Sequence, residues 1–241
     1  MSLEAKDIYK SYGPTEVLKG VSLELEQGEF VALLGPSGSG KTTLLNIIAG
    51  LVHPDSGTLS LNGEEFTRVA ARERRFGMVF QSYALFRHMT VRDNISFGLR
   101  ILPRSKRPSR SDIVAKTDDL LEMIGLPDLA DRFPAQLSGG QRQRVAMARA
   151  LAINPKVLLM DEPFSALDAH IRSGLREQVR DIQRKAGVAA IMVTHDKSEA
   201  VALADRIAVM DHGRIVQFDQ QEKLKSSPST LAVASLMRGA A

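Results

Sequence analysis

The stretch Gly35-Pro36-Ser37-Gly38-Ser39-Gly40-Lys41-Thr42-Thr43 organises the 241-residue chain. It follows an apolar run at 30–34 and precedes a helical pattern that starts at Leu44. A G-x-x-x-x-G-K-[ST] loop between a buried strand and a helix start is typical of phosphate binding. Glycines let the backbone approach a ligand closely, and the N-terminus of a helix adds partial positive charge.

Individual residues of this loop predict separate tasks. The backbone N–H groups of 38–43 are expected to point inward at phosphate oxygens. Lys41 supplies a mobile cation for the β- and γ-phosphates, and Thr42 offers a hydroxyl to Mg²⁺. The competing interpretation is an ordinary glycine-rich turn, which the flanking strand and helix disfavour. The sequence therefore predicts a site for a nucleotide and Mg²⁺.

Composition sets limits on the fold and its surroundings. The length suits one large α/β domain or a core with a subdomain, and a hydrophobic fraction of 44% can supply the core. A net charge of +4 fits an acidic partner, but on charge alone an ordinary mixed surface is the favoured interpretation. The chain has no cysteine, which agrees with a reducing compartment. It has neither a signal region at its start nor a run of about 18 apolar residues, so a membrane role is expected only as a soluble subunit.

Two kinds of strand pattern are present. Alternating apolar and polar residues predict half-buried strands at 3–12, 21–25 and 58–61, which suggests an antiparallel sheet beside the phosphate loop. Tyr12, just before a Gly-Pro break, either lies in the core or presents its ring to a purine, and spacing alone favours the core. Continuous apolar runs near 76–80, 157–160, 188–193 and 207–210 instead indicate a mostly parallel sheet covered on both faces.

The region between the two halves of this pattern is mainly helical. Thr90 is a candidate cap for a helix over 91–99, a second helix is expected at 112–124, and Ser138 is a plausible cap for an alanine-rich helix. We therefore expect one domain in which 1–82 and 156–241 form the core and 83–155 form a helical subdomain.

Chemically useful residues follow the expected parallel strands, whose carboxyl ends gather functional groups. Asp161 is suited to hold Mg²⁺ or its water, Gln81 to link the metal or the γ-phosphate to the next loop, and Lys41 to bind phosphate. Glu162 can accept a proton from an attacking water, and His195 can donate to the γ-phosphate. Without a catalytic role, Glu162 would be a surface carboxylate and His195 a hydrogen-bonded histidine at a strand end.

The pentapeptide Leu137-Ser138-Gly139-Gly140-Gln141, about 20 residues before Asp161 and Glu162, resembles the signature of ATP-binding cassette (ABC) ATPases. With the phosphate loop it makes a specific match over nearly the whole chain. The resemblance implies that Tyr12 stacks on adenine, that the signature residues bind ATP, and that the loop at 165–168 contacts the partner subunit. The implied ATP-contacting residues are Tyr12, Gly35, Pro36, Ser37, Gly38, Ser39, Gly40, Lys41, Thr42, Thr43, Ser138, Gly139, Gly140, Gln141 and Asp168.

The resemblance also implies an assembly. In this family the signature of one copy binds the γ-phosphate of ATP held by a second copy, so a head-to-tail homodimer encloses two ATP molecules. Segments 81–91, 93–99 and 131–137 are similar to importer ATPases of the sulfate/thiosulfate group. The implied partners are two membrane permeases and an extracytoplasmic solute-binding protein, with this chain on the cytoplasmic face of the membrane.

Other interpretations stay open at this stage. Importers of other solutes share most of the similarity, and a separate-chain exporter is possible. A soluble ABC ATPase acting on nucleic acid or ribosomes is disfavoured, because the chain has no coiled-coil insertion, no second cassette and no base-stacking pattern. Group members usually carry a β-rich regulatory domain after the position of Met237, and we expect it to be absent here.

Overall fold

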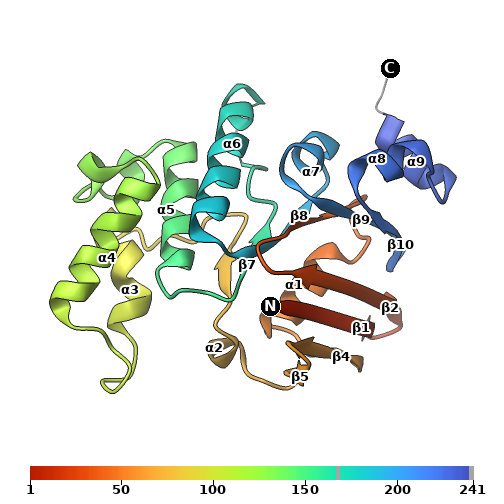
Figure 1. Ribbon diagram of the computed structural model, residues 1–241, viewed down its shortest axis with the longest axis horizontal. Coiled ribbons are helices and arrows are strands. Elements are labelled where there is room, and N and C mark those ends of the chain that lie inside the picture. Colours follow the sequence, from red (N-terminus) through yellow and green to blue (C-terminus); the bar gives the residue numbers. More distant parts are fainter. Residues whose placement is uncertain (167–168, 239–241) are drawn as a thin grey trace.

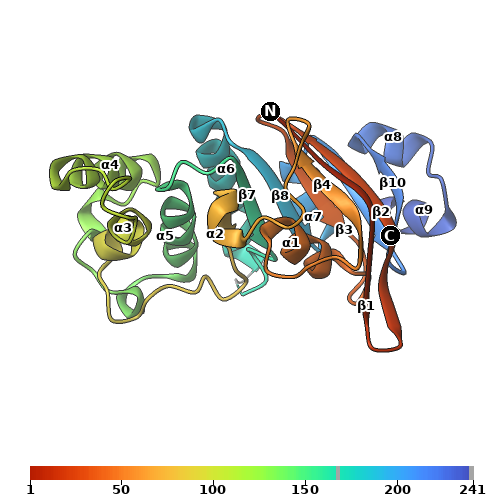
Figure 2. The same ribbon diagram turned by 90° about the horizontal axis from the view of Figure 1, so that it is seen from below.

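Two sheets form the framework of the computed structural model, which describes residues 1–166 and 169–238. The first is antiparallel, with strand order β2-β1-β4-β5. It forms the right-hand base of the molecule in Figure 1, and Figure 2 shows the β1–β2 hairpin extending from the body. Its strands are β1 (Ser2–Tyr12), β2 (Thr15–Glu26), β4 (Ser56–Leu61) and β5 (Glu64–Glu65).

The second sheet is mostly parallel and has the order β10-β9-β3-β8-β7-β6. Its five neighbouring strands from β9 to β6 run parallel, and β10 pairs antiparallel at one edge. The strands are β3 (Phe30–Leu34), β6 (Gly77–Val79), β7 (Val157–Asp161), β8 (Ala189–Thr194), β9 (Arg206–Asp211) and β10 (Arg214–Asp219).

The parallel sheet separates two hydrophobic cores, because alternate side chains of a strand point to opposite faces. Val31 and Leu33 of β3 pack with α1 and the antiparallel sheet. Ala32 and Leu34 pack with the helices of the other face. All five residues of β3 are buried, which explains the continuous apolar run in the sequence.

The longer helices surround these sheets. Figure 1 shows α3, α4 and α5 together on one side of the molecule and α8 and α9 at the opposite end. The helices are α1 (Lys41–Ala49), α2 (Ala71–Arg74), α3 (Val91–Arg100), α4 (Arg110–Met123), α5 (Gly139–Leu151), α6 (Ala169–Ala186), α7 (Lys197–Leu203), α8 (Gln221–Ser226) and α9 (Leu231–Arg238), with short 3-10 turns at Pro127–Leu129 and Pro134–Gln136. Within the described residues, no helix is both long and apolar enough to cross a membrane.

The α/β fold class, with its mostly parallel sheet, flanking antiparallel sheet and helices, is confirmed. The expected cap of α3 by Thr90 is present, as its side chain accepts a hydrogen bond from the Asp93 N–H. The sequence analysis missed α2, α8 and α9. Within the helix expected at 112–124, Val114 is 45% exposed and does not belong to the buried stripe. The division into a core and a helical subdomain at 83–155 stays our interpretation, since one hydrophobic core includes residues of both.

Candidate functional site

The phosphate loop leads directly from β3 into α1. Gly40 is the residue before the helix, and its φ of 97° lies in the left-handed region that favours glycine. A methyl group added there would lie 2.7 Å from Leu18 Cδ2 and 2.9 Å from the Val17 carbonyl oxygen, so β2 leaves no space for a side chain. None of the described side chains caps α1. Its first N–H groups therefore need another acceptor, which a bound anion can supply.

Lys41 lies inside this loop. Its ammonium group donates hydrogen bonds to the carbonyl oxygens of Gly35 and Pro36 at 2.9 and 2.8 Å. It also lies 3.3 Å from the Ser39 hydroxyl. Burial lowers the pKa of Lys41, while the nearby Glu162 and Asp161 carboxylates act in the opposite direction. The loop thus holds a partly desolvated cation close to two carboxylates.

The register of the parallel sheet brings the other predicted groups to the same edge. Leu34 pairs with Thr194 and Asp161 with Val193, so β3, β7 and β8 end level with one another. Val79 pairs with Met160, which places Gln81 at the end of the next strand. The Gln81 side chain is exposed and makes no hydrogen bond with the described residues.

Thr42 and Asp161 meet across this edge, with a hydrogen bond of 3.0 Å from the Thr42 hydroxyl to Asp161 Oδ1. Burial raises the pKa of Asp161; the Thr42 hydrogen bond and Lys41 oppose the rise, and Glu162 adds to it. A hydroxyl and a carboxylate oxygen side by side are hard ligands that suit Mg²⁺. The described residues contain no cluster of three acidic or histidine side chains that could hold a metal alone. Further ligands would have to come from a bound phosphate or water.

Glu162 is held in an unusual conformation. Its φ of 42° is left-handed, a strained geometry that is often found at functional sites. Its N–H donates to the Val193 carbonyl oxygen at 3.1 Å, and its own carbonyl accepts from the Ser165 hydroxyl at 2.9 Å. His195 Nδ1 lies 3.4 Å from Glu162 Oε2. The backbone of Glu162 is thus fixed on both sides while its carboxylate faces the histidine.

Tyr12 differs from the expectation based on spacing. The core assignment is wrong, because the side chain is 50% exposed at the end of β1. Period-2 spacing failed here because Tyr12 belongs to the hairpin end, where no second layer covers the strand. Lys10 Nζ lies 5.5 Å from the centre of its ring. Tyr12 ends β1, and β2, the second strand of the same hairpin, passes Gly40 of the phosphate loop with Val17 and Leu18.

The signature residues are located on a different element. Ser138 caps α5: its side chain accepts from the Gln141 N–H, and the Gln141 side chain accepts from the Ser138 N–H in return. Gly139 and Gly140 form the first turn. In the described part of the chain, no hydrogen bond or ion pair joins 138–141 to the phosphate loop. Asp168 and Leu167 lie outside the described residues.

Sequence reasoning missed the residues that secure the loop after Gln81. Asn94 is fully buried, and its amide donates to the carbonyl oxygens of Met89 and Thr90, at 3.2 and 2.9 Å. Arg149 of α5 donates to the carbonyl oxygens of Tyr83 and Ala84. Tyr83 in this loop is only 5% exposed. No sequence pattern singled out this contact, because α5 carries three arginines, Arg142, Arg144 and Arg149.

Comparison with known proteins identifies the family. The profile described as ABC transporter matches residues 18–165, which is more than half of the chain. The chain belongs to the ABC transporter family. This confirms the resemblance that the phosphate loop and the pentapeptide indicated.

The curated relatives narrow the resemblance. The chain is 54% identical to the sulfate/thiosulfate import ATP-binding protein CysA of Escherichia coli (strain K12) over 237 residues, which cover 98% of this chain and 65% of that protein. Its identity to the protein of the same name from Bradyrhizobium diazoefficiens is also 54%, over 97% of this chain and 68% of that one. The chain therefore spans about two thirds of the length of these relatives.

Solved structures support the same fold. A dimeric post-hydrolysis structure of the ATP-binding cassette MJ0796, bound to ADP and Pi, is 33% identical and superposes with a TM-score of 0.76 over 90% of this chain and 98% of that one. The ADP conformation of the cassette MJ1267 gives a TM-score of 0.84 at 27% identity, over 97% of this chain and 98% of that one. The first of these ABC cassettes forms a dimer.

Proposed function

We propose that this chain is the ATP-hydrolysing subunit of an ABC importer for sulfate or thiosulfate. One observation carries the ATPase part: Thr42, Asp161, Glu162 and His195 meet at the edge of the sheet where the phosphate loop begins α1. The solute is proposed from the names of the relatives, at 54% identity.

In the proposed site the triphosphate lies over the start of α1. The backbone N–H groups of 38–43 donate to its oxygens, and Lys41 exchanges its carbonyl contacts at Gly35 and Pro36 for the β- and γ-phosphates. This exchange is favourable because a buried ammonium gains more from an anion than from neutral carbonyls. Thr42 and Asp161 would hold Mg²⁺, with Gln81, in the loop after β6, as a further candidate ligand. When bound, the metal offsets negative charge on the phosphates.

Hydrolysis requires a proton acceptor near the γ-phosphate, and Glu162 is suited to that task. A water oxygen attacks the γ-phosphorus, the bond to the β–γ bridging oxygen breaks, and the water proton passes to the Glu162 carboxylate. The strained backbone at Glu162 and its contact with Ser165 limit how far the carboxylate can move. His195 lies 3.4 Å from Glu162 and can orient it or donate to the phosphate.

The proposed active unit is a homodimer. Ser138, Gly139 and Gly140 form a helix start that is exposed at Ser138 and makes no hydrogen bond with the chain's own phosphate loop within the described residues. A second copy, arranged head to tail, would place them against the ATP of its partner, with Gln141 and Asp168 as additional contacts. The dimeric structures of related cassettes support this assembly.

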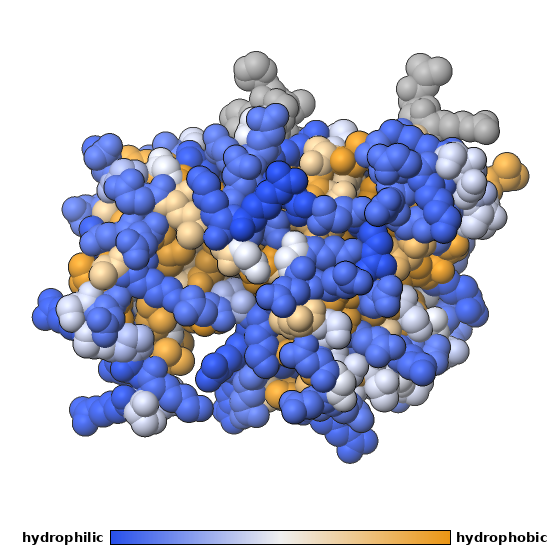
Figure 3. Space-filling model, viewed as in Figure 1, coloured by the Kyte–Doolittle hydropathy of each residue, from blue (hydrophilic) through white to orange (hydrophobic). Residues whose placement is uncertain are grey.

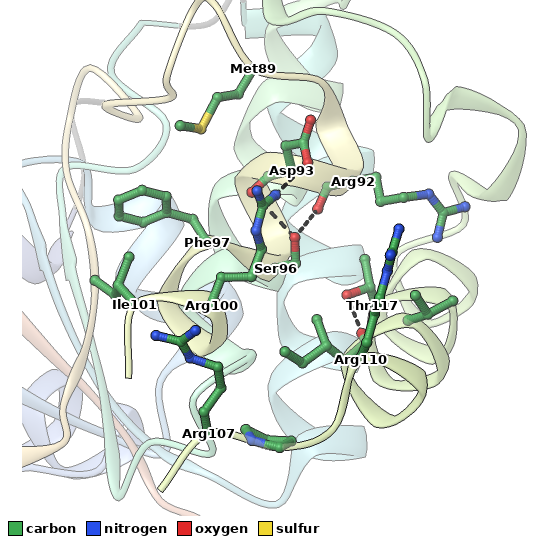
Figure 4. Close-up of a pocket in the computed structure, with 13 residues that line it drawn as sticks. Met89, Arg92, Asp93, Ser96, Phe97, Arg100, Ile101, Arg107, Arg110 and Thr117 are labelled. Atoms are coloured by element: carbon green, nitrogen blue, oxygen red, sulfur yellow. Dashed lines mark hydrogen bonds and ion pairs between the residues drawn. The ribbon is translucent and has the colours of Figure 1, made fainter. Parts of the chain in front are cut away.

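A groove of about 740 Å³ between α3, α4 and the segment joining them suits a permease. Figure 4 shows that side chains of α3, such as Phe97 and Arg100, and of the connecting segment, such as Arg107, surround it. Four arginines and one carboxylate, Asp93, contribute to its lining. Figure 3 shows apolar residues among hydrophilic ones on this side of the molecule, with further apolar residues elsewhere on the same face. We propose that a cytoplasmic permease segment with apolar and acidic side chains binds here, close to the end of the loop that starts at Gln81.

This partnership gives the proposed location. The chain would sit peripherally on the cytoplasmic face of the membrane, beneath two permeases that receive solute from an extracytoplasmic binding protein. Substituting Arg110, at the rim of the groove, by glutamate should weaken association with permeases about tenfold through charge reversal. A pull-down of detergent-solubilised permeases measures this. Exposed Lys185 of α6, changed to glutamate, is the matched control, and equal losses in both variants would contradict the groove assignment.

The function is tested by reconstitution. The chain, candidate permeases and binding protein are incorporated into liposomes, and ATP hydrolysis and sulfate uptake are measured together. We expect Mg²⁺-dependent hydrolysis that sulfate-loaded binding protein stimulates, and Glu162→Gln should lower it at least about 100-fold. Hydrolysis stimulated by another solute would reject the sulfate assignment alone. Stimulation by nucleic acid, with none by permeases, would favour the soluble alternative.

A further inference from the structure

Arg149 connects α5, the helix that begins at the signature, to the loop that begins at Gln81. Its two terminal nitrogens donate to neighbouring carbonyl oxygens, with Nη1 to Ala84 at 2.7 Å and Nη2 to Tyr83 at 2.9 Å. The guanidinium also lies 5.4 Å from the centre of the Phe86 ring. A planar, two-pronged donor fits two adjacent carbonyls as a single-point cation cannot.

The backbone that receives these bonds is strained. Tyr83 and Ala84 have φ values of 61° and 48°, so two consecutive residues other than glycine are left-handed. Such residues persist only where the surroundings hold them, because the left-handed region is unfavourable for residues other than glycine. The fork of Arg149 supplies that hold, since both carbonyls that it binds belong to the strained pair.

The Arg149 guanidinium has no competing ion pair among the described residues. Burial lowers the pKa of Arg149, and it has no carboxylate within ion-pair distance among the described residues. At its far end the same loop is tied to α3 by Asn94, whose Oδ1 accepts from the Phe86 N–H at 2.8 Å and whose amide donates to the Phe86 carbonyl at 3.1 Å. Between these anchors and β6, Phe80, Gln81 and Ser82 are exposed, and the Tyr83 N–H donates to the Phe80 carbonyl oxygen at 2.8 Å.

We infer that Arg149 is a positioning residue that makes the Gln81 loop and the signature helix move as one body. The inference rests on the proposed ATPase function for its consequence in catalysis, but not for the contact itself. When α5, which carries Ser138 at its start, is displaced, the Tyr83–Ala84 turn would move with it, because the Arg149 guanidinium is hydrogen-bonded to both residues of the turn. Gln81, two residues earlier, would follow. Closure at the signature would thereby set the position of the glutamine at the γ-phosphate.

Because the chain contains no cysteine, two spin labels can be attached at introduced cysteines only. Exposed Ser82 in the loop and exposed Ala135, just before the signature, are suitable sites. Pulsed dipolar spectroscopy then measures the distribution of distances between the labels. The test variants are Arg149→Ala and Arg149→Lys, the second of which keeps the charge but loses the fork. The matched control is Arg144→Ala: this arginine also lies on α5, has its pKa lowered by burial, and donates to a carbonyl, that of Ile124, rather than to the loop.

We expect both Arg149 variants to broaden the distance distribution and to lower kcat about tenfold with KM for ATP little changed, since the phosphate loop is untouched. Arg144→Ala should leave the distribution narrow. An unchanged distribution in a folded Arg149→Lys protein would overturn the inference, and so would broadening without loss of kcat. If the parent protein hydrolyses no ATP, the proposed function fails, while the distance measurement still decides whether the fork holds the loop.

Discussion

The two helix starts that define the candidate site, those of α1 and α5, differ in how they are capped. α1 begins after Gly40, and no described side chain satisfies its first N–H groups. α5 begins at Ser138, which forms a complete capping box with Gln141. An uncapped helix start depends on a ligand for its hydrogen bonds, whereas a capped one is stable alone and keeps its exposed hydroxyl for a later contact.

This difference shows which part of the nucleotide site one chain forms by itself and which part needs a second chain. At α1 the chain itself supplies cation, hydroxyl and carboxylates, because β3, β7 and β8 end at the same level. At α5 it supplies a glycine turn with no opposing groups from the described residues. We therefore expect ATP binding to be a property of one chain, and hydrolysis to be a property of two.

The largest expected effect comes from mixing two variants, one defective at the start of α1 and the other defective at the start of α5. Lys41→Ala should abolish phosphate binding, and Ser138→Glu should repel the γ-phosphate of the partner copy, so each variant alone is inactive. An equal mixture should recover about a quarter of the parental ATPase activity, because half of the dimers are mixed and each has one intact site. Steady-state ATPase assays of the mixture measure the recovery.

Mixing Lys41→Ala with Glu162→Gln is the control. This mixture should recover no activity beyond each variant alone, since both changes affect the part of the site formed around α1 and leave no chain with that part intact. Failure of the first mixture to exceed the control would contradict the division between the two starts.

A second, smaller effect concerns the nucleotide base. If the exposed ring of Tyr12 stacks on adenine, Tyr12→Ala should raise KM for ATP about tenfold, in keeping with the usual worth of base stacking, while Tyr12→Phe should not. The measurement is the ATP dependence of hydrolysis. Tyr9→Ala is a matched control on the same strand, because this tyrosine is 40% exposed and its ring lies against Gly20. Equal changes for Tyr9 and Tyr12 would show that the hairpin, not the Tyr12 ring, is responsible.

The α1 region could be predicted from sequence almost completely, and the α5 region only in part. Local patterns were enough for the phosphate loop: an apolar run, a glycine loop and a helical pattern follow one another, and parallel strands bring their ends together. Arg149 and Asn94 could not be predicted, because their partners are backbone carbonyls of an irregular loop, and such carbonyls have no sequence signature. The exposure of Tyr12 was missed because alternation shows which residues share a face but not whether a second layer covers it.

A stability comparison tests whether the Ser138 cap has a task beyond folding. Ser109 and Ser138 each form a capping box, at the starts of α4 and α5. Replacing either by alanine should lower the free energy of unfolding by about 1 kcal/mol. Chemical denaturation measures this loss, and only Ser138→Ala should also reduce ATPase activity. A similar reduction in Ser109→Ala would mean that helix stability, not contact with nucleotide, explains the effect of the signature serine.

The smallest expected effect concerns the carboxylate at the α1 side. Because the pKa of Asp161 is raised by burial and by Glu162, the folded state holds its proton more tightly than the unfolded state does. Stability from this group is therefore full below the ordinary pKa of 3.8 and is lost as pH rises through the raised value. Asp161→Asn keeps an acceptor for the Thr42 hydroxyl and removes the desolvated charge, so in the absence of nucleotide its Tm at neutral pH should rise by a few degrees. Thermal unfolding at pH 4 and pH 7 measures the gain in Tm, which should shrink at the lower pH.

With ATP and Mg²⁺ present, Asp161→Asn should have a lower Tm than the parent protein, because ligand binding stabilises only a chain whose carboxylate can help to hold the metal. A gain that persists unchanged with the ligand would mean that Asp161 is not part of the metal site, and the contrast between the two helix starts would then rest on Lys41 and Glu162 alone.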